Sequence, residues 1–94
     1  MKLIIAIVND DFSNKVIKTL MKNKVRTTKL SSTGGFLKAG NTTLLIGAED
    51  EDIDSVVEMI ERECKSTKVK EGSKEITVSG ANLFIMDIDQ YLKI

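Results

Sequence analysis

Histidine is missing from all 94 residues, and Cys64 is the single cysteine. Without histidine, the chain lacks the usual ligand of catalytic zinc and the usual base of a catalytic triad. One cysteine cannot form an internal disulfide, and Cys64 falls on the apolar stripe of a predicted helix, which is typical of a core residue rather than a nucleophile. We therefore expect no enzymatic activity, no metal ion, no cofactor and a reducing, cytoplasmic environment.

The chain also lacks net charge and a long hydrophobic run. Its 14 basic and 14 acidic side chains cancel, so no overall field would attract a nucleic acid polymer or an anionic membrane. The apolar run at residues 3–8 is too short to span a membrane, and no signal-peptide cleavage site follows it. The central strands predicted below carry no pair of aromatic residues, which a sheet that binds single-stranded RNA would need. We expect neither nucleic acid nor membrane as a partner.

What remains is the composition of a small folded domain. With 41% apolar and 30% charged residues, the chain is predicted to form one domain over residues 1–94. A chain of this length leaves a large share of its surface in contact with water, so its own core must be modest. Burial between subunits would supplement that core.

Residues 3–8 form a continuous apolar run, which predicts a central strand with both faces covered. Apolar residues at helical spacing predict a first helix, capped by Asp10 or Asp11 and ending near Asn23, and a second from Ile53 to Cys64. Acidic residues before the second helix suit its electropositive start. Further strands are predicted at residues 25–32 and 41–47, and as a hairpin of 75–78 with 83–88. An exposed loop at 65–73 and a closing turn at 89–94 complete the prediction.

The predicted order is strand, helix, strand, strand, helix, strand, with the last strand doubled back. Two helices on one face of an antiparallel sheet would bury the apolar faces of all these elements. We therefore predict an α+β protein with a ferredoxin-like sandwich of βαββαβ order.

The segment between the second and third of these strands has the composition of a ligand-binding loop. Gly34, Gly35 and Gly40 permit positive φ and let backbone amides turn inward together, which forms a nest for phosphate oxygens. The GxxxxGK[ST] spacing of a Walker loop is absent. A wide hairpin loop whose glycines relieve turn strain would have the same composition.

Residues beside this loop favour the ligand interpretation. Arg26 and Thr28 share one face of the strand that enters it, where a guanidinium can pair with phosphate and a hydroxyl can bond a base edge. Asn41 leaves the loop, and its amide matches the N6 and N7 edge of adenine. Phe36 would be exposed at the loop tip unless it stacks on a base or a neighbouring subunit. Each residue alone is also compatible with a solvated surface, but their concentration within residues 26–41 indicates a site.

At this point the chain resembles the PII-like receptors of cyclic di-AMP found in Gram-positive bacteria. The resemblance is carried by residues 1–8, Arg26, 28–30, 33–37, 39–43, Gly47 and 78–90. Its most specific part is Thr-Gly-Gly-Phe-Leu at 33–37 followed by Ala-Gly-Asn-Thr-Thr at 39–43.

The resemblance implies a homotrimer with one site for cyclic di-AMP in each cleft between neighbouring subunits. By matching position, Arg26 would lie near phosphate, and Thr28 and Asn41 would read adenine. Phe36 would pack against a base. The remaining implied pocket residues are Gly35, Leu37, Gly47 and Phe84.

The chain also departs from that family. Family members carry a long insertion after the second helix, whereas Ser66 to Ser73 is a short polar connection here. Lys24 stands where some relatives have asparagine. The signalling loop and ATP motifs of true PII regulators are absent, so ATP and 2-oxoglutarate are not implied.

Two alternative functions stay open: a trimer that binds another adenine nucleotide, and a structural trimer without ligand. Signal output would need a downstream protein partner that the sequence does not identify.

Overall fold

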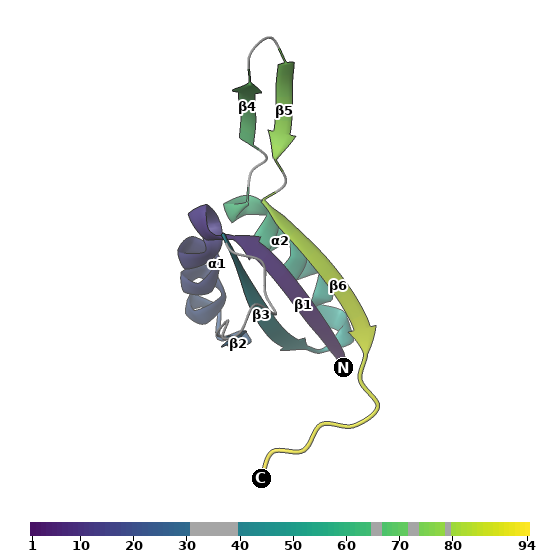
Figure 1. Cartoon of the computed structure of the whole chain (residues 1–94). Helices are drawn as coiled ribbons and strands as arrows, with labels where there is room; N and C mark the ends of the chain where they lie inside the picture. Colours follow the sequence, from purple (N-terminus) through teal and green to yellow (C-terminus); the bar gives the residue numbers. More distant parts are fainter. Residues whose placement is uncertain (31–39, 65–66, 72–73, 79) are drawn as a thin grey trace.

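The computed structural model describes residues 1–30, 40–64, 67–71, 74–78 and 80–94 (Figure 1). Two α-helices and a short 3₁₀ turn lie among the strands of the described chain. In order the elements are β1 (Lys2–Asn9), α1 (Asp10–Lys22), β2 (Arg26–Leu30), β3 (Asn41–Ala48), the short 3₁₀ turn η1 (Asp50–Asp52), α2 (Ile53–Glu63), β4 (Thr67–Glu71), β5 (Lys74–Val78) and β6 (Ala81–Asp87).

The described residues form a four-stranded sheet in the order β2-β3-β1-β6, in which every neighbouring pair is antiparallel. Helices α1 and α2 lie against one face of this sheet (Figure 1). The α+β class is confirmed, and the arrangement is compatible with a ferredoxin-like fold. Neither described helix has the length and hydropathy needed to cross a membrane.

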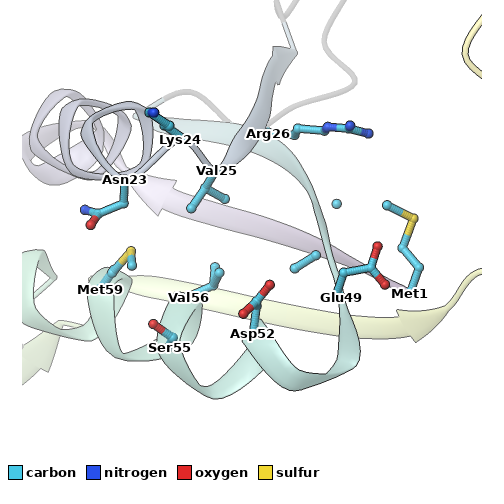
Figure 2. A pocket seen from close by; sticks show the side chains of 12 residues that line it. Met1, Asn23, Lys24, Val25, Arg26, Glu49, Asp52, Ser55, Val56 and Met59 are labelled. Atoms are coloured by element: carbon cyan, nitrogen blue, oxygen red, sulfur yellow. The ribbon is translucent and has the colours of Figure 1, made fainter.

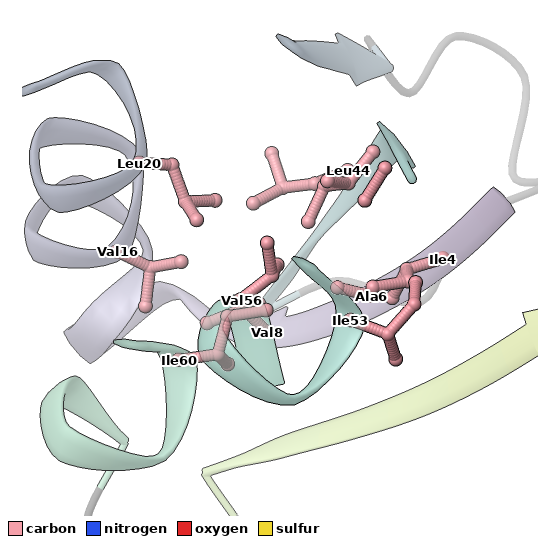
Figure 3. Packing of buried hydrophobic residues seen from close by; sticks show 11 residues of the cluster. Ile4, Ala6, Val8, Val16, Leu20, Leu44, Ile53, Val56 and Ile60 are labelled. Atoms are coloured by element: carbon pink, nitrogen blue, oxygen red, sulfur yellow. The ribbon is translucent and has the colours of Figure 1, made fainter. Parts of the chain in front are cut away.

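The core lies between the helices and the sheet (Figure 3). Alternate residues of the central strands point into it, because side chains of a strand alternate between the two faces. Helical residues at spacings of three and four complete it, as the apolar periodicity predicted. Its fully buried side chains are Ile4, Ala6, Val8, Val16, Leu20, Leu44, Ile46, Val56 and Ile60.

The predicted cap of α1 was wrong by one or two residues. The side chain of Asn9 caps the helix, because its Oδ1 accepts a hydrogen bond from the backbone N–H of Asp11 at 2.9 Å. Asp10 is engaged elsewhere, since its carboxylate accepts a hydrogen bond of 2.6 Å from the hydroxyl of Thr42 on β3. At the other end, Lys24 adopts a φ of 58°, the left-handed conformation that ends many helices, and the chain turns into β2.

The prediction that both faces of β1 are covered is wrong within the single chain. Only the face toward the helices is buried, and Leu3, Ile5 and Ile7 are half-buried on the other. We call this uncovered side of the sheet the open face. It also carries Phe84 and Met86 of β6, which are 55% and 46% exposed.

Two further predictions fail between α2 and the last strand. Residues 65–73 were expected to be a loop, yet residues 67–71 form β4, which pairs with β5 in a separate two-stranded sheet. The expected hairpin of residues 75–78 with 83–88 is therefore absent, and β6 pairs with β1 instead. The lysines of β4 hid its strand character, because a two-stranded ribbon does not need the apolar alternation of a strand that covers a core.

The predicted closing turn at residues 89–94 is also not formed. No helix or strand follows β6, and residues 88–94 run out from the end of that strand (Figure 1). We call this segment the tail. Its last apolar residues, Leu92 and Ile94, are exposed, so they do not hold the tail in a closing turn.

Gly80 falls between residues 75–78 and 83–88, where the predicted hairpin would place it in the turn, but in the structure it is a packing residue. It lies directly before β6, where its carbonyl accepts a hydrogen bond from the N–H of Asn9 at 2.9 Å. A Cβ at this position would meet the Cβ of Cys64 at 2.9 Å and the backbone of the same residue at 3.0 Å. Only glycine allows the end of α2 to approach β6 this closely.

We therefore expect Gly80→Ala to destabilise the fold by about 1–3 kcal/mol, the usual cost of forcing an extra methyl group into a packed site. Chemical denaturation measures the change. Gly47→Ala is the matched control, because a Cβ at Gly47 meets only Met1 Cε at 3.9 Å and alanine should be tolerated there. Equal stability of the two variants would contradict the close packing of Gly80 against Cys64.

Candidate functional site

The open face places several predicted site residues in rows that cross the sheet. One row runs Arg26, Gly47, Leu3, Met86, and the next runs Thr28, Leu45, Ile5, Phe84. Arg26 and Thr28 therefore lie on the same face, as their spacing predicted. Gly47 stands beside Arg26 on the neighbouring strand.

A cavity of about 200 Å³ lies at this end of the open face. Three residues of the predicted set line it, namely Arg26, Thr28 and Gly47. Apolar side chains of β1 and β3 form its floor, and Ile88 and Tyr91 of the tail close one side. The tail residues were missed from the sequence, where residues 89–94 were assigned to a closing turn.

A second cavity of about 400 Å³ lies on the other side of Arg26, between the start of β2 and α2 (Figure 2). Figure 2 shows Lys24 and Arg26 on its β2 side, and Asp52 on its α2 side with Glu49 nearby. Arg26 and Gly47 line both cavities. The carboxylates of Glu49 and Asp52 would repel a phosphate in the larger cavity. The described lining of the smaller cavity includes no carboxylate. The smaller cavity is therefore the better place for an anionic group.

The other predicted residues do not reach this cavity within one chain. Asn41 opens β3 while Gly47 lies near its end, so about 20 Å of strand separates them. Phe84 shares a row with Thr28, but two strands lie between them, a separation of about 14 Å. The predicted Gly35, Phe36 and Leu37 lie outside the described residues. Within one chain, the predicted site residues therefore lie at both ends and at both edges of the sheet, and not around one cavity.

Arg26 is available to bind an anion. The ion pairs of the described chain join the Met1 ammonium to Asp50 at 3.2 Å and Lys2 to Asp87 at 2.6 Å, and neither includes Arg26. Its guanidinium carbon lies instead over the ring of Tyr91, 5.4 Å from the centroid. Among the described residues, no carboxylate therefore neutralises the charge of Arg26.

The tail is fixed where it leaves the sheet. The backbone N–H of Ile88 donates to the carbonyl of Met1 at 3.2 Å, and the Lys2 ammonium donates to the Asp87 carboxylate. That hydrogen bond, reinforced by attraction between the charges, lowers the pKa of Asp87 and raises the pKa of Lys2. These contacts hold the first tail residues beside the cavity that Tyr91 lines.

Cys64 lies beside Gly80, at the Asn9 end of β1, whereas this cavity lies at the Met1 end. Burial raises the pKa of its thiol, and the charge of Glu63 adds to the effect, so the reactive thiolate is disfavoured. It packs against the core as a partly buried apolar residue, as predicted. Within the described ranges, no three acidic or cysteine side chains come together in a way that could hold a metal ion.

These features define a small α+β protein with an apolar sheet face left open and an arginine-lined cavity at one end of it. The chain belongs to the cyclic-di-AMP receptor family, whose model matches residues 1–74. The predicted resemblance is confirmed at the level of the family. Among solved structures, the chain is similar to a protein of unknown function from Pediococcus pentosaceus. The two are 37% identical over 99% of this chain and 96% of that chain, with a TM-score of 0.79.

The Lys2–Asp87 pair makes a testable contribution to stability. Since the pKa of Asp87 is lowered in the folded protein, the pair stabilises the fold above the ordinary carboxyl value of 3.8, and this contribution disappears as the pH falls through the lowered pKa. We expect Asp87→Asn to be less stable than the wild type at neutral pH, with a difference that shrinks in acid. The effect should be small, because both groups are accessible to water.

Denaturation midpoints measured across the pH range test this expectation. Asp89→Asn is the control, because Asp89 forms no ion pair in the described part of the chain. A stability difference between Asp87→Asn and the wild type that stayed constant from neutral to acidic pH would rule out the ion pair as its source.

Proposed function

We propose that this chain is a non-enzymatic, cytoplasmic sensor that binds cyclic di-AMP in the clefts of a PII-like homotrimer. The family of the chain supports cyclic di-AMP as the ligand and favours a binding protein over an enzyme. The observation that carries the proposal is the cavity at the end of the open face. There Arg26, which pairs with no carboxylate of the described residues, lies with Thr28 and Gly47.

The chemistry of these three residues suits a purine nucleotide. A guanidinium forms charge-assisted hydrogen bonds with phosphate oxygens, and cyclic di-AMP carries two phosphodiester charges. The Thr28 hydroxyl can donate to or accept from a base edge. Gly47 leaves open space beside Arg26, since a Cβ there would meet only the end of the Met1 side chain. The ring of a base can approach the sheet through that space.

The division of the site within one chain supports an assembly. Asn41 lies about 20 Å along β3 from Gly47, so a ligand near Arg26 would need Asn41 from another subunit. The open face supplies apolar surface for that subunit, including Phe84 and Met86. Burying this surface between copies would supply stability that the small core of one chain lacks.

Two alternatives remain for the same fold. A PII-like trimer could bind another adenine nucleotide, because Thr28 and Asn41 recognise adenine rather than the cyclic linkage. A structural trimer without ligand would use the open face alone.

For a sensor, binding stabilises the liganded state by mass action, and an unidentified downstream protein binds that state. We expect the loop at residues 33–40 to respond to the ligand, although its residues 33–39 lie outside the described residues.

Calorimetric titration with cyclic di-AMP, ATP and cyclic di-GMP separates these functions. We expect cyclic di-AMP to bind best. Arg26→Ala should weaken binding about 10- to 100-fold, because hydrogen bonds to charged groups are worth roughly 1.5–3 kcal/mol. Asn41→Ala should also weaken binding. Lys29→Ala is the matched control, since it removes an exposed positive charge from the opposite face of the same strand.

Heat from ATP alone would favour the other adenine nucleotide. No heat from any of the three nucleotides would favour the structural trimer. Equal losses for Arg26→Ala and Lys29→Ala would show that the open face is not the binding surface.

The assembly has its own test. Light scattering should give a mass of about 31 kDa, three times the 10.4 kDa of the chain. Met86→Glu should lower that mass, because it places a charge on the face that we propose to be buried between subunits. Ile85→Glu is the matched control, because the two residues are adjacent on β6 and almost equally exposed, 45% for Ile85, but point to opposite faces. A monomeric wild type would contradict the proposed cleft.

A further inference from the structure

We propose that Tyr91 is a positioning residue, which holds Arg26 over the cavity so that the guanidinium is ready to bind a phosphate group. The inference rests on the proposed function for the identity of the ligand. It starts from the one contact that the Arg26 guanidinium makes in the described chain, the ring of Tyr91 at 5.4 Å. Both residues line the cavity that Thr28 and Gly47 also line.

The chemistry of this contact differs from that of an ion pair. A cation is attracted to the negative face of an aromatic ring, so the ring restrains the guanidinium without neutralising its charge. The N–H groups of arginine point outward in the plane of the guanidinium, and they remain available for the oxygen atoms of a ligand. A carboxylate partner would have occupied these donors. Tyr91 therefore orients Arg26 and leaves its binding capacity intact.

The path of the tail explains how Tyr91 reaches Arg26 from the far side of the sheet. Arg26 is on the edge strand β2 and the tail leaves from the opposite edge strand, β6. The backbone hydrogen bond from Ile88 to Met1 fixes the tail at the end of the sheet, three residues before Tyr91. From there the chain needs only a short extended segment to bring the ring over the long Arg26 side chain.

This arrangement links the tail to the occupancy of the cavity. A flexible arginine must lose side-chain entropy when it binds, and a ring that already restrains it reduces that cost. Any increase in affinity that Tyr91 provides must appear as an equal stabilisation of the tail contact by the ligand, because coupling between two sites is reciprocal. A ligand bound at Arg26 would therefore stabilise the contact between the tail and Arg26.

The contact itself can be tested in the free protein by nuclear magnetic resonance. The side-chain protons of Arg26 should be shifted upfield by the ring of Tyr91, and Tyr91→Leu should remove that shift. Tyr91→Phe should keep it, because the ring and not the hydroxyl makes the contact. Arg62, the other arginine of the chain, is the internal control and should not move. An Arg26 spectrum that is the same in wild type and Tyr91→Leu would overturn the inference.

The effect on binding is measured by titration with cyclic di-AMP. Tyr91→Leu should bind about two- to fivefold more weakly, the range expected for a cation–π contact at an accessible site, and Tyr91→Phe should match the wild type. In an Arg26→Gln background, Tyr91→Leu should cause no further loss. A loss that persists without Arg26, or that Phe does not rescue, would overturn the positioning role.

The two experiments separate failure of this inference from failure of the proposed function. An absent ring-current shift in the free protein overturns the role of Tyr91, whatever the ligand. A normal shift in a protein that does not bind cyclic di-AMP overturns the proposed function instead.

Discussion

The structure depends on the two-sided character of the central strands β1 and β3. Their side chains alternate between a face that α1 and α2 bury and a face that neither helix covers. The inner residues, such as Ile4 and Leu44, supply the burial that holds the sheet and helices together. The outer residues, such as Ile5 and Leu45, are apolar as well. One chain therefore folds with an apolar surface left over, and the candidate site lies at the edge of that surface.

The second constraint is electrostatic. The described residues pair the Met1 ammonium and Lys2 with carboxylates at the end of the sheet, while Arg26, a short distance away, contacts only an aromatic ring. The neighbouring carboxylates of Glu49 and Asp52 line the larger cavity and are absent from the described lining of the smaller one. A local anion site thus exists in a chain whose net charge is zero.

Sequence reasoning succeeded where a pattern reflects a local contact. The helical spacing from Ile53 to Ile60 predicted α2, and two-residue alternation predicted that Arg26 and Thr28 share a face. It failed where a long-range contact decided the outcome. The apolar run of β1 could not reveal whether one or both of its faces are covered. The lysine-rich sequence of β4 did not indicate that this segment pairs with β5. Gly80 was interpreted as a turn residue, because its close approach to Cys64 comes from the packing of α2.

The order of residues was enough to establish the α+β class, the helix-facing core and the family, because all three follow from local periodicity and from short segments read along the chain. Tertiary structure decided which site residues meet. Arg26 and Gly47 are 21 positions apart and become neighbours through the register of β2 and β3. Asn41, although closer to Gly47 in the chain, is held at the other end of the strand. Tyr91 reaches Arg26 because the backbone hydrogen bond from Ile88 to Met1 holds the start of the tail at that end of the sheet. Proximity in space depends on strand pairing and chain reversal, which no local pattern encodes.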